Sequence, residues 1–333
     1  MPASPKKSSR TAPPAAVGMI GLGIMGSAMS ANLVKAGFEV FGYDPVESAC
    51  KKLRKAGGTP CDSAVEVAKR CGRIVLSLPS EAALDAVCAE LLAAGVANRV
   101  LAETSTLPEP AKLRARDALA ARGLVLLDCP LSGTGGQAVT RDLAVYASGD
   151  AKAIAAFGPV FEGFARVRYD VGEFGNGIRM KLVANLLVAI HNLSTAEAIL
   201  LGQRSGLDPA QVVRVVADGA GGSRMFQVRG PMMVDRSWDA ATMKVSIWQK
   251  DMKLIHEALQ RTGTPAPLFA ATLPVYNAAM ALGHGEDDTA AVYSVLEHMI
   301  GTAPARGGKA AKSATSVKTA KSATVPKAGK KKR

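Results

Sequence analysis

The sequence predicts an α/β fold in which a doubly wound parallel sheet is followed by an all-helical domain, the two being joined by a long helix. In the first half, short apolar runs alternate with alanine-rich segments of helical composition. The runs lie at residues 17–20, 39–43, 73–78, 99–102 and 124–127. Strands that alternate with helices are typical of a parallel sheet covered on both faces.

The second half is predicted to be helical throughout. The stretch from Gly177 to Arg204 holds no proline and, after its first residue, only Gly202 as a glycine. One helix of roughly 40 Å fits it at ~1.5 Å per residue. Further helices are predicted at 209–217, 242–260, 268–282 and 289–299. The predicted domains are residues 15–176 and 177–300.

The two ends of the chain are predicted to be disordered, as a lead-in (1–14) and a Lys/Ala-rich tail (301–333) that cannot bury enough apolar surface to fold alone. Thirteen of the 41 basic residues lie in 1–10 and 301–333, where no acidic residue occurs, so residues 11–300 carry 28 of each sign. This balance disfavours a nucleic-acid-binding domain in the body. We expect that any nucleic-acid contact is weak, nonspecific and made by the tail.

Cysteine and histidine spacing predicts no metal site. The five cysteines include no C-x-x-C pair and the four histidines no H-x-x-x-H pair. An odd cysteine set without a disulfide framework fits a reducing compartment, so we expect a cytoplasmic protein. We expect no membrane partner, because no uninterrupted apolar run reaches the ~18 residues of a membrane span.

A glycine-rich turn follows the first predicted strand and opens a helix. Gly21 permits a tight turn, Gly23 lets the backbone approach a pyrophosphate, and Gly26 allows close packing of helix and strand. The N–H groups of the helix N-terminus then face the phosphates. Asp44 ends the second strand, where a carboxylate accepts hydrogen bonds from ribose hydroxyls. The pattern predicts a Rossmann-type dinucleotide site, with NAD favoured over NADP because Asp44 would repel a 2'-phosphate.

Two later features are candidates for substrate chemistry. Residues 132–136, Ser-Gly-Thr-Gly-Gly, follow a strand and offer N–H groups and hydroxyls to a small carboxylate; the alternative is a flexible turn. Lys181 lies in an otherwise apolar helix with Asn185 one turn further on. A dry environment lowers a lysine pKa toward the range useful for proton transfer. The alternative is a lysine that extends to solvent.

Five motifs occur in order between about residues 17 and 299. They are Gly18–Gly26, Asp128–Gly133, Gly175–Gly177 with Lys181 and Asn185, Lys250–Asp251, and Gly283–Asp288. Together they resemble the β-hydroxyacid dehydrogenases, a family that includes 3-hydroxyisobutyrate dehydrogenase, tartronate semialdehyde reductase and L-threonate dehydrogenase. The resemblance implies an NAD-dependent oxidoreductase that transfers a hydride between a small 3-hydroxy acid and the nicotinamide, with NADP as the other candidate cofactor.

The resemblance also implies the role of each site residue. Lys181 would be the general acid/base and Asn185 would position substrate and lysine. The substrate is expected to contact Ser132, Gly133, Thr134, Asn185 and Lys250. The cofactor is expected to contact Gly21, Leu22, Gly23, Ile24, Met25, Gly26, Asp44, Leu78, Pro79, Thr106, Lys250 and Asp251. Because the helical domain dimerises in families of this kind, we expect a homodimer or homotetramer.

Departures from the family pattern limit the substrate prediction. Thr134 stands where glycine is usual, and Arg141-Asp142 replaces a usual Gly-Thr. Residues 221–226 look most like the threonate dehydrogenase branch, which favours a polar three- or four-carbon acid. Two alternatives are a non-catalytic dinucleotide-binding protein held to nucleic acid by its tail, and an imine reductase of the same fold. The presence of Lys181 together with Asn185 argues against the non-catalytic protein, and Lys181 also argues against the imine reductase.

Overall fold

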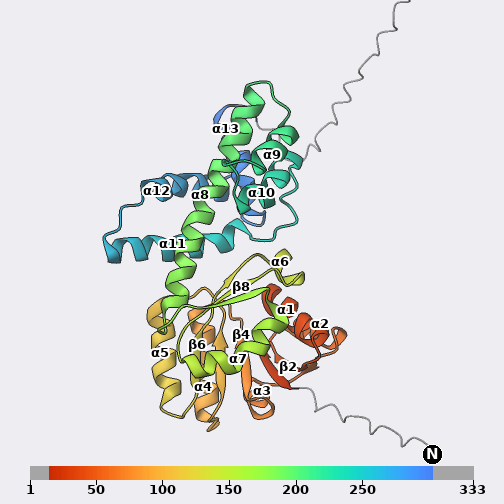
Figure 1. The fold of residues 1–333 in the computed structure, drawn as a ribbon, viewed down its shortest axis with the longest axis vertical. Helices are drawn as coiled ribbons and strands as arrows, with labels where there is room; N and C mark the ends of the chain where they lie inside the picture. Colours follow the sequence, from red (N-terminus) through yellow and green to blue (C-terminus); the bar gives the residue numbers. More distant parts are fainter. Residues whose placement is uncertain (1–14, 303–333) are drawn as a thin grey trace, which may run out of the picture.

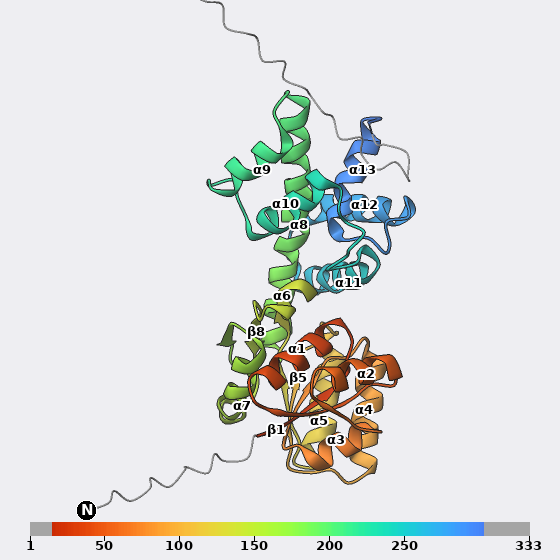
Figure 2. The same ribbon diagram turned by 90° about the vertical axis from the view of Figure 1, so that its right-hand side faces the viewer.

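The computed structural model describes residues 15–302 (Figures 1 and 2). A sheet domain and a helical domain are connected by one long helix, α8 (Asn176–Arg204), as both views show. The predictions for the lead-in and for all but the first two residues of the tail, including nucleic-acid contact, lie outside the described residues.

The sheet domain contains six parallel strands in the order β3-β2-β1-β4-β5-β6. The strands are β1 (Ala16–Ile20), β2 (Glu39–Tyr43), β3 (Thr59–Pro60), β4 (Arg73–Leu76), β5 (Val100–Glu103) and β6 (Val125–Asp128). Ile20 at the end of β1 pairs with Tyr43 of β2 and with Leu76 of β4. The strand order reverses between β1 and β4, and the crevice at that point is where open α/β sheets bind ligands.

Helices cover both faces of the sheet, as predicted. They are α1 (Ile24–Lys35), α2 (Glu47–Lys55), α3 (Ala64–Arg70), α4 (Glu81–Ala93), α5 (Glu109–Ala120) and α7 (Ala151–Phe164). On one face, Leu33 of α1 and Phe157 of α7 pack into a core with β1. On the other face, residues of α3, α4 and α5 such as Leu84 pack against Ile74.

A second, three-stranded sheet was not predicted. It consists of β7 (Leu131–Ser132), β8 (Ala144–Ala147) and β9 (Val167–Asp170), and the short helix α6 (Gly135–Val139) follows β7. β8 pairs antiparallel with β7 and parallel with β9. Strands of two to four residues are too short for a readable pattern. This sheet carries the Ser132 turn toward the helical domain.

The helical domain packs around α8. Its other helices are α9 (Pro209–Ala217), α10 (Arg224–Asp235), α11 (Val245–Thr262), α12 (Pro267–Ala281), the 3-10 turn η1 (Thr289–Ala291) and α13 (Val292–Met299). Helix α10, which contains Pro231, was not predicted from the sequence. A proline inside a helix removes one backbone hydrogen bond, so tertiary packing overrides local propensity here.

Helix α8 is long and apolar enough to meet a membrane-span criterion, although no uninterrupted apolar run does so. Its most apolar 18-residue window has a mean hydropathy of 1.4, and 44% of that window is buried in the protein. α8 packs against α10, α11 and α13, and it carries Lys181, Asn185 and Asn192 as buried polar side chains. The central helix of a folded domain meets the same criterion.

Candidate active site

The glycine turn between β1 and α1 has the geometry that the sequence pattern predicts. Gly21 has a φ of +90°, and a Cβ there would lie 2.1 Å from the carbonyl oxygen of Ser77. A Cβ on Gly26 would lie 2.0 Å from the carbonyl oxygen of Gly21. A Cβ on Gly23 would meet open space. The turn is therefore closely packed on the protein side and open at Gly23, the position where a pyrophosphate would approach.

The N-terminus of α1 is available to an anion. Gly23 is its N-cap and contributes no side-chain hydrogen bond, and Ile24 at the first helical position is 61% exposed. The first N–H groups of a helix have no partner within the helix and carry its positive dipole end. These features fit the pyrophosphate of a dinucleotide.

A cavity of about 660 Å³ extends from this turn along the carboxyl ends of the strands. It contains nine of the residues predicted to contact the cofactor: Gly21, Gly23, Ile24, Met25, Asp44, Leu78, Pro79, Thr106 and Asp251. Leu22, Gly26 and Lys250 are not among its lining residues. Leu22 is buried, and Gly26 packs against the turn itself.

Asp44 holds the glycine turn in addition to lining the cavity. Its carboxylate accepts hydrogen bonds from the N–H groups of Leu22 (2.7 Å) and Val46 (2.8 Å). Pro45 and Val46, which follow it, also line the cavity, whereas the basic residues of α2 do not. Lys51 of α2 instead pairs with Glu47 at 2.8 Å. Among the described residues, the cavity wall beside Asp44 therefore contains no basic side chain of α2.

A second cavity, of about 430 Å³, lies beside the turn after β7 and includes Ser132, Gly133 and Thr134. Gly133 has a φ of +137°, and a Cβ there would lie 2.6 Å from Leu143 Cδ2. The Thr134 N–H donates to Gln137 Oε1 at 3.1 Å. That N–H is therefore occupied, and the candidate donors to a carboxylate in this turn are the hydroxyl groups of Ser132 and Thr134 and the N–H of Gly133.

Lys181 lines both cavities. It projects from the first third of α8 and is only 8% exposed, so it does not extend to solvent. Burial lowers the pKa of Lys181; the positive charge of Lys250 acts in the same direction, and Asp251 opposes them. A lowered lysine pKa makes the neutral amine accessible as a proton acceptor.

Asn185 is connected by a hydrogen bond to Asp251, which lines the dinucleotide cavity. Its Nδ2 donates to Asp251 Oδ2 at 2.9 Å, while Asp251 Oδ1 lies 3.2 Å from the Lys250 ammonium. Lys250 donates to the carbonyl oxygen of Thr106 in the sheet domain. Lys250 itself is not among the residues that line either cavity, and its contact with Thr106 joins the two domains.

A buried charge cluster that the sequence analysis missed anchors the start of α8. Asp128 Oδ2 accepts from the N–H of Ile178 at 2.8 Å. Lys112 Nζ lies 2.6 Å from both Asp128 Oδ1 and Glu103 Oε2, and all three side chains are fully buried. Because removal of one partner from a buried ion pair typically costs ~3–5 kcal/mol, this cluster fixes the helix that carries Lys181 to the ends of β5 and β6.

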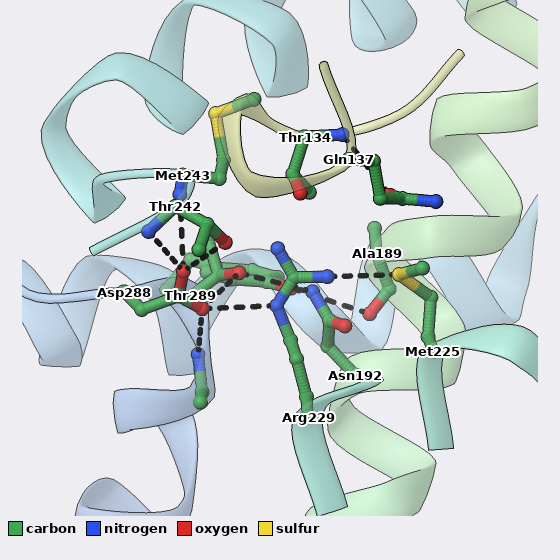
Figure 3. A network of polar contacts seen from close by, with 12 residues as sticks. Thr134, Gln137, Ala189, Asn192, Met225, Arg229, Thr242, Met243, Asp288 and Thr289 are labelled. Carbon is green, nitrogen blue, oxygen red and sulfur yellow. Dashed lines mark hydrogen bonds and ion pairs between the residues drawn. The ribbon is translucent and has the colours of Figure 1, made fainter. Parts of the chain in front are cut away.

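A second buried ion pair, between Arg229 and Asp288, lies at the wall of the smaller cavity that the helical domain forms (Figure 3). Arg229 Nε donates to Asp288 Oδ1 at 3.0 Å. Asp288 Oδ2 accepts from the N–H groups of Thr242 (2.9 Å) and Met243 (3.0 Å). Burial acts to raise the pKa of Asp288, but Arg229 and these hydrogen bonds outweigh it and lower that pKa. Asp288, the last residue of the Gly283–Asp288 motif, thus holds the backbone of Met243 in place, and Met243 lines both cavities.

Comparisons with known proteins agree with this geometry. Residues 16–173 match the NAD binding domain of 6-phosphogluconate dehydrogenase, and residues 175–296 match a model described as NAD-binding of NADP-dependent 3-hydroxyisobutyrate dehydrogenase. An L-threonate dehydrogenase of Cupriavidus necator is 32% identical over 84% of this chain and 95% of its own length. Glyoxylate/succinic semialdehyde reductase 2 of Arabidopsis thaliana is 31% identical over 84% of this chain and 79% of its own length.

A solved structure shows the same architecture. The 3-hydroxyisobutyrate dehydrogenase of Mycobacterium tuberculosis, described with L-serine, is 26% identical with a TM-score of 0.76, over 85% of this chain and 99% of that one. The two matching domain models lie in the order in which the sheet and helical domains occur here. The chain therefore belongs to the β-hydroxyacid dehydrogenase family and is an NAD(P)-dependent dehydrogenase of small hydroxy acids.

Proposed function

We propose that Lys181 is the general acid/base in the NAD-dependent oxidation of a polar three- or four-carbon 3-hydroxy acid, and in the reverse reduction. The observation that carries this proposal is the position of Lys181, which lies in the wall shared by the dinucleotide cavity and the smaller cavity. A proton acceptor at that junction would lie between a bound cofactor and a bound hydroxy acid.

NAD, when bound, accepts the hydride from the carbon that carries the hydroxyl group. The neutral Lys181 amine takes the hydroxyl proton as the carbonyl forms, and the ammonium returns it in the reduction. Ser132, Gly133 and the Thr134 hydroxyl hold the substrate carboxylate. Because Asn185 Nδ2 donates to Asp251, its amide oxygen is left to accept from the substrate hydroxyl or from Lys181.

A polar substrate is supported by the walls of the smaller cavity and by the relatives. Thr134 and Gln137 contribute polar groups to the lining. L-threonate, named in the Cupriavidus necator relative, is a polar four-carbon acid. L-Threonate is therefore the first compound to test, followed by 3-hydroxyisobutyrate and L-serine.

Steady-state formation of NADH with a panel of hydroxy acids tests the proposal. We expect turnover with at least one 3-hydroxy acid and none with acids that lack a hydroxyl group. A cyclic imine with NADPH tests the imine reductase alternative, for which we expect no turnover. Absence of activity with every acid in the panel, or activity only with the imine, would contradict the proposal.

We also propose that the protein acts as a homodimer or homotetramer. Helices α5, α8 and α11 form an apolar groove of about 800 Å³ that includes Leu113, Val183 and Leu187. Val183 is 59% exposed and Leu187 47% exposed in the single chain. Exposed apolar patches of this kind mark interaction surfaces. Sedimentation of the wild type and of Val183→Glu tests this surface, and a monomeric wild type would contradict it; a cytoplasmic location stays a prediction.

A further inference from the structure

The exposed side of the smaller cavity contains a group of charged side chains that the proposed reaction does not use. Arg166 precedes β9, Arg224 opens α10 in the helical domain, and Asp142 lies between them. Asp142 Oδ1 accepts from Arg166 Nε at 2.9 Å, and Asp142 Oδ2 accepts from Arg224 Nη2 at 2.7 Å. One carboxylate therefore faces two guanidinium groups.

The same group is connected to the turn that would hold the substrate carboxylate. Gln137 Nε2 donates to Asp142 Oδ2 at 3.0 Å, and Gln137 Oε1 accepts from the Thr134 N–H. Hydrogen bonds from Gln137 and Arg166, together with the charge of Arg224, lower the pKa of Asp142, so it is ionised near neutral pH. The Ser132 turn and the two arginines are thus connected by one network of hydrogen bonds.

The charges of this group do not cancel. Arg229 also lines the cavity, but its charge is matched by the buried Asp288. Within residues 15–302, Arg166 and Arg224 have no acidic partner other than Asp142. Arg166 and Arg224 together carry two positive charges against the one negative charge of Asp142, so one positive charge of this group remains uncompensated.

The two arginines are free to accept a ligand. Their side chains are 63% and 62% exposed, and exposed ion pairs of this kind contribute little to stability. The contacts to Asp142 use one nitrogen of each guanidinium, and the remaining N–H groups form planar forks that match a carboxylate.

From this charge excess we infer that the cavity binds hydroxy acids that carry a second carboxylate, which lies against the exposed guanidinium groups of Arg166 and Arg224, the specificity-determining residues. The inference rests on the proposed function, because the first carboxylate and the hydroxyl are placed by Ser132 and Lys181. A single excess charge favours a carboxylate over a phosphate monoester, which carries nearly two charges at neutral pH.

Three matched acids test the inference: 2-(hydroxymethyl)succinate, the same acid with its distal carboxylate replaced by a carboxamide, and 3-hydroxyisobutyrate. We expect kcat/KM for the diacid to exceed that of the carboxamide by at least about tenfold, since charge-assisted hydrogen bonds are roughly twice as strong as neutral ones. The preference should weaken with added salt. Equal efficiencies for the diacid and the carboxamide would overturn the inference.

Variants separate an anion site from a structural bridge between the domains. Arg224→Met and Arg166→Met should each lower the diacid:carboxamide ratio about tenfold, mainly through KM of the diacid. Asp142→Asn breaks the same contacts but adds to the positive excess, so it should raise that ratio. Arg114→Met removes an exposed arginine paired with Glu81 on a remote surface and should change neither value. A fall of the ratio in Asp142→Asn as well would show a structural role only.

Calorimetric titration of the diacid into the NADH-loaded protein separates failure of the inference from failure of the proposed function. If no acid is oxidised, the proposed function is wrong, and the second-carboxylate site is then judged by binding alone. Tighter binding of the diacid than of the carboxamide, lost in Arg224→Met, supports the site. Equal binding of the two acids overturns it.

Discussion

The two cavities that meet at Lys181 are built from different parts of the chain. The part of the dinucleotide cavity around the glycine turn depends on features within residues 20–46: a turn with a positive φ, a helix N-terminus and one carboxylate at a strand end. The smaller cavity depends on charged side chains from distant segments, such as Asp142 and Arg224, which are 82 residues apart. This part of the cofactor site is thus specified locally in the sequence, whereas the smaller cavity depends on tertiary structure.

Replacement of Lys181 by alanine should have the largest effect, because this residue serves both cavities. We expect kcat to fall by about 10²-fold or more, the usual scale for loss of a general acid/base, while NAD still binds. Turnover assays and fluorescence titration of the cofactor measure the two quantities. Lys152→Ala, an exposed lysine on α7, is the control and should be neutral. Retained turnover in Lys181→Ala would exclude the proposed role.

Two glycine variants test whether the dinucleotide cavity is a backbone site. In Gly26→Ala the new Cβ would lie 2.0 Å from a carbonyl oxygen, and overpacking of this kind costs ~1–3 kcal/mol, so Tm should fall by several degrees. In Gly23→Ala the new Cβ meets open space at an ordinary φ of −64°. Its Tm should stay unchanged while NAD binds at least about tenfold more weakly. Normal NAD affinity in Gly23→Ala would show that the pyrophosphate does not approach this position.

The choice between NAD and NADP depends on one side chain of the same local segment. A hydrogen bond from a ribose hydroxyl to a charged acceptor contributes ~1.5–3 kcal/mol, and ~1.4 kcal/mol corresponds to tenfold. We therefore expect kcat/KM to favour NAD by at least about tenfold, and Asp44→Asn to reduce that preference. Lys51→Ala is the control for assistance from α2. Equal efficiencies in the wild type would show that Asp44 does not recognise the ribose.

The same two regions of the molecule differ in how far the sequence predicts their structure. The five long strands of the sheet, the helix at 209–217 and the glycine turn were predicted because each is specified by neighbouring residues. Of the two alternatives left open for Lys181, a dry environment and a side chain that extends to solvent, the structure shows the first. In each case a short pattern, such as an apolar run between turn residues, carries the information.

Features that depend on distant contacts were missed. Lysine side chains are usually exposed, so nothing in the sequence indicates that Lys112 is buried. Only the fold brings it between Glu103 and Asp128. The pairing of Asp142 with Arg166 and Arg224 joins three segments without a shared motif. The departure from the family pattern at Arg141-Asp142 was the one available signal, and its partners could not be read from it.

The smallest expected effect is a shift in the pH dependence of kcat/KM. It tests how Asp251 and Lys250 act on the pKa of Lys181. Oxidation needs the neutral amine, so kcat/KM should rise with pH through the Lys181 pKa, which burial lowers. Asp251 acts to raise that pKa and Lys250 to lower it. Asp251→Asn should therefore move the rise to lower pH, and Lys250→Met should move it to higher pH.

Opposite displacements are the informative result, because Asp251→Asn also disturbs the contact of Asp251 with Asn185, and Lys250→Met removes the contact of Lys250 with Thr106. A purely structural disturbance would lower the plateau of the profile in both variants and leave the midpoint in place. The reduction requires the ammonium form, so its profile should fall with rising pH and its midpoint should shift in the same direction for each variant. If the midpoints for oxidation and reduction shift in different directions, the group that titrates is not Lys181.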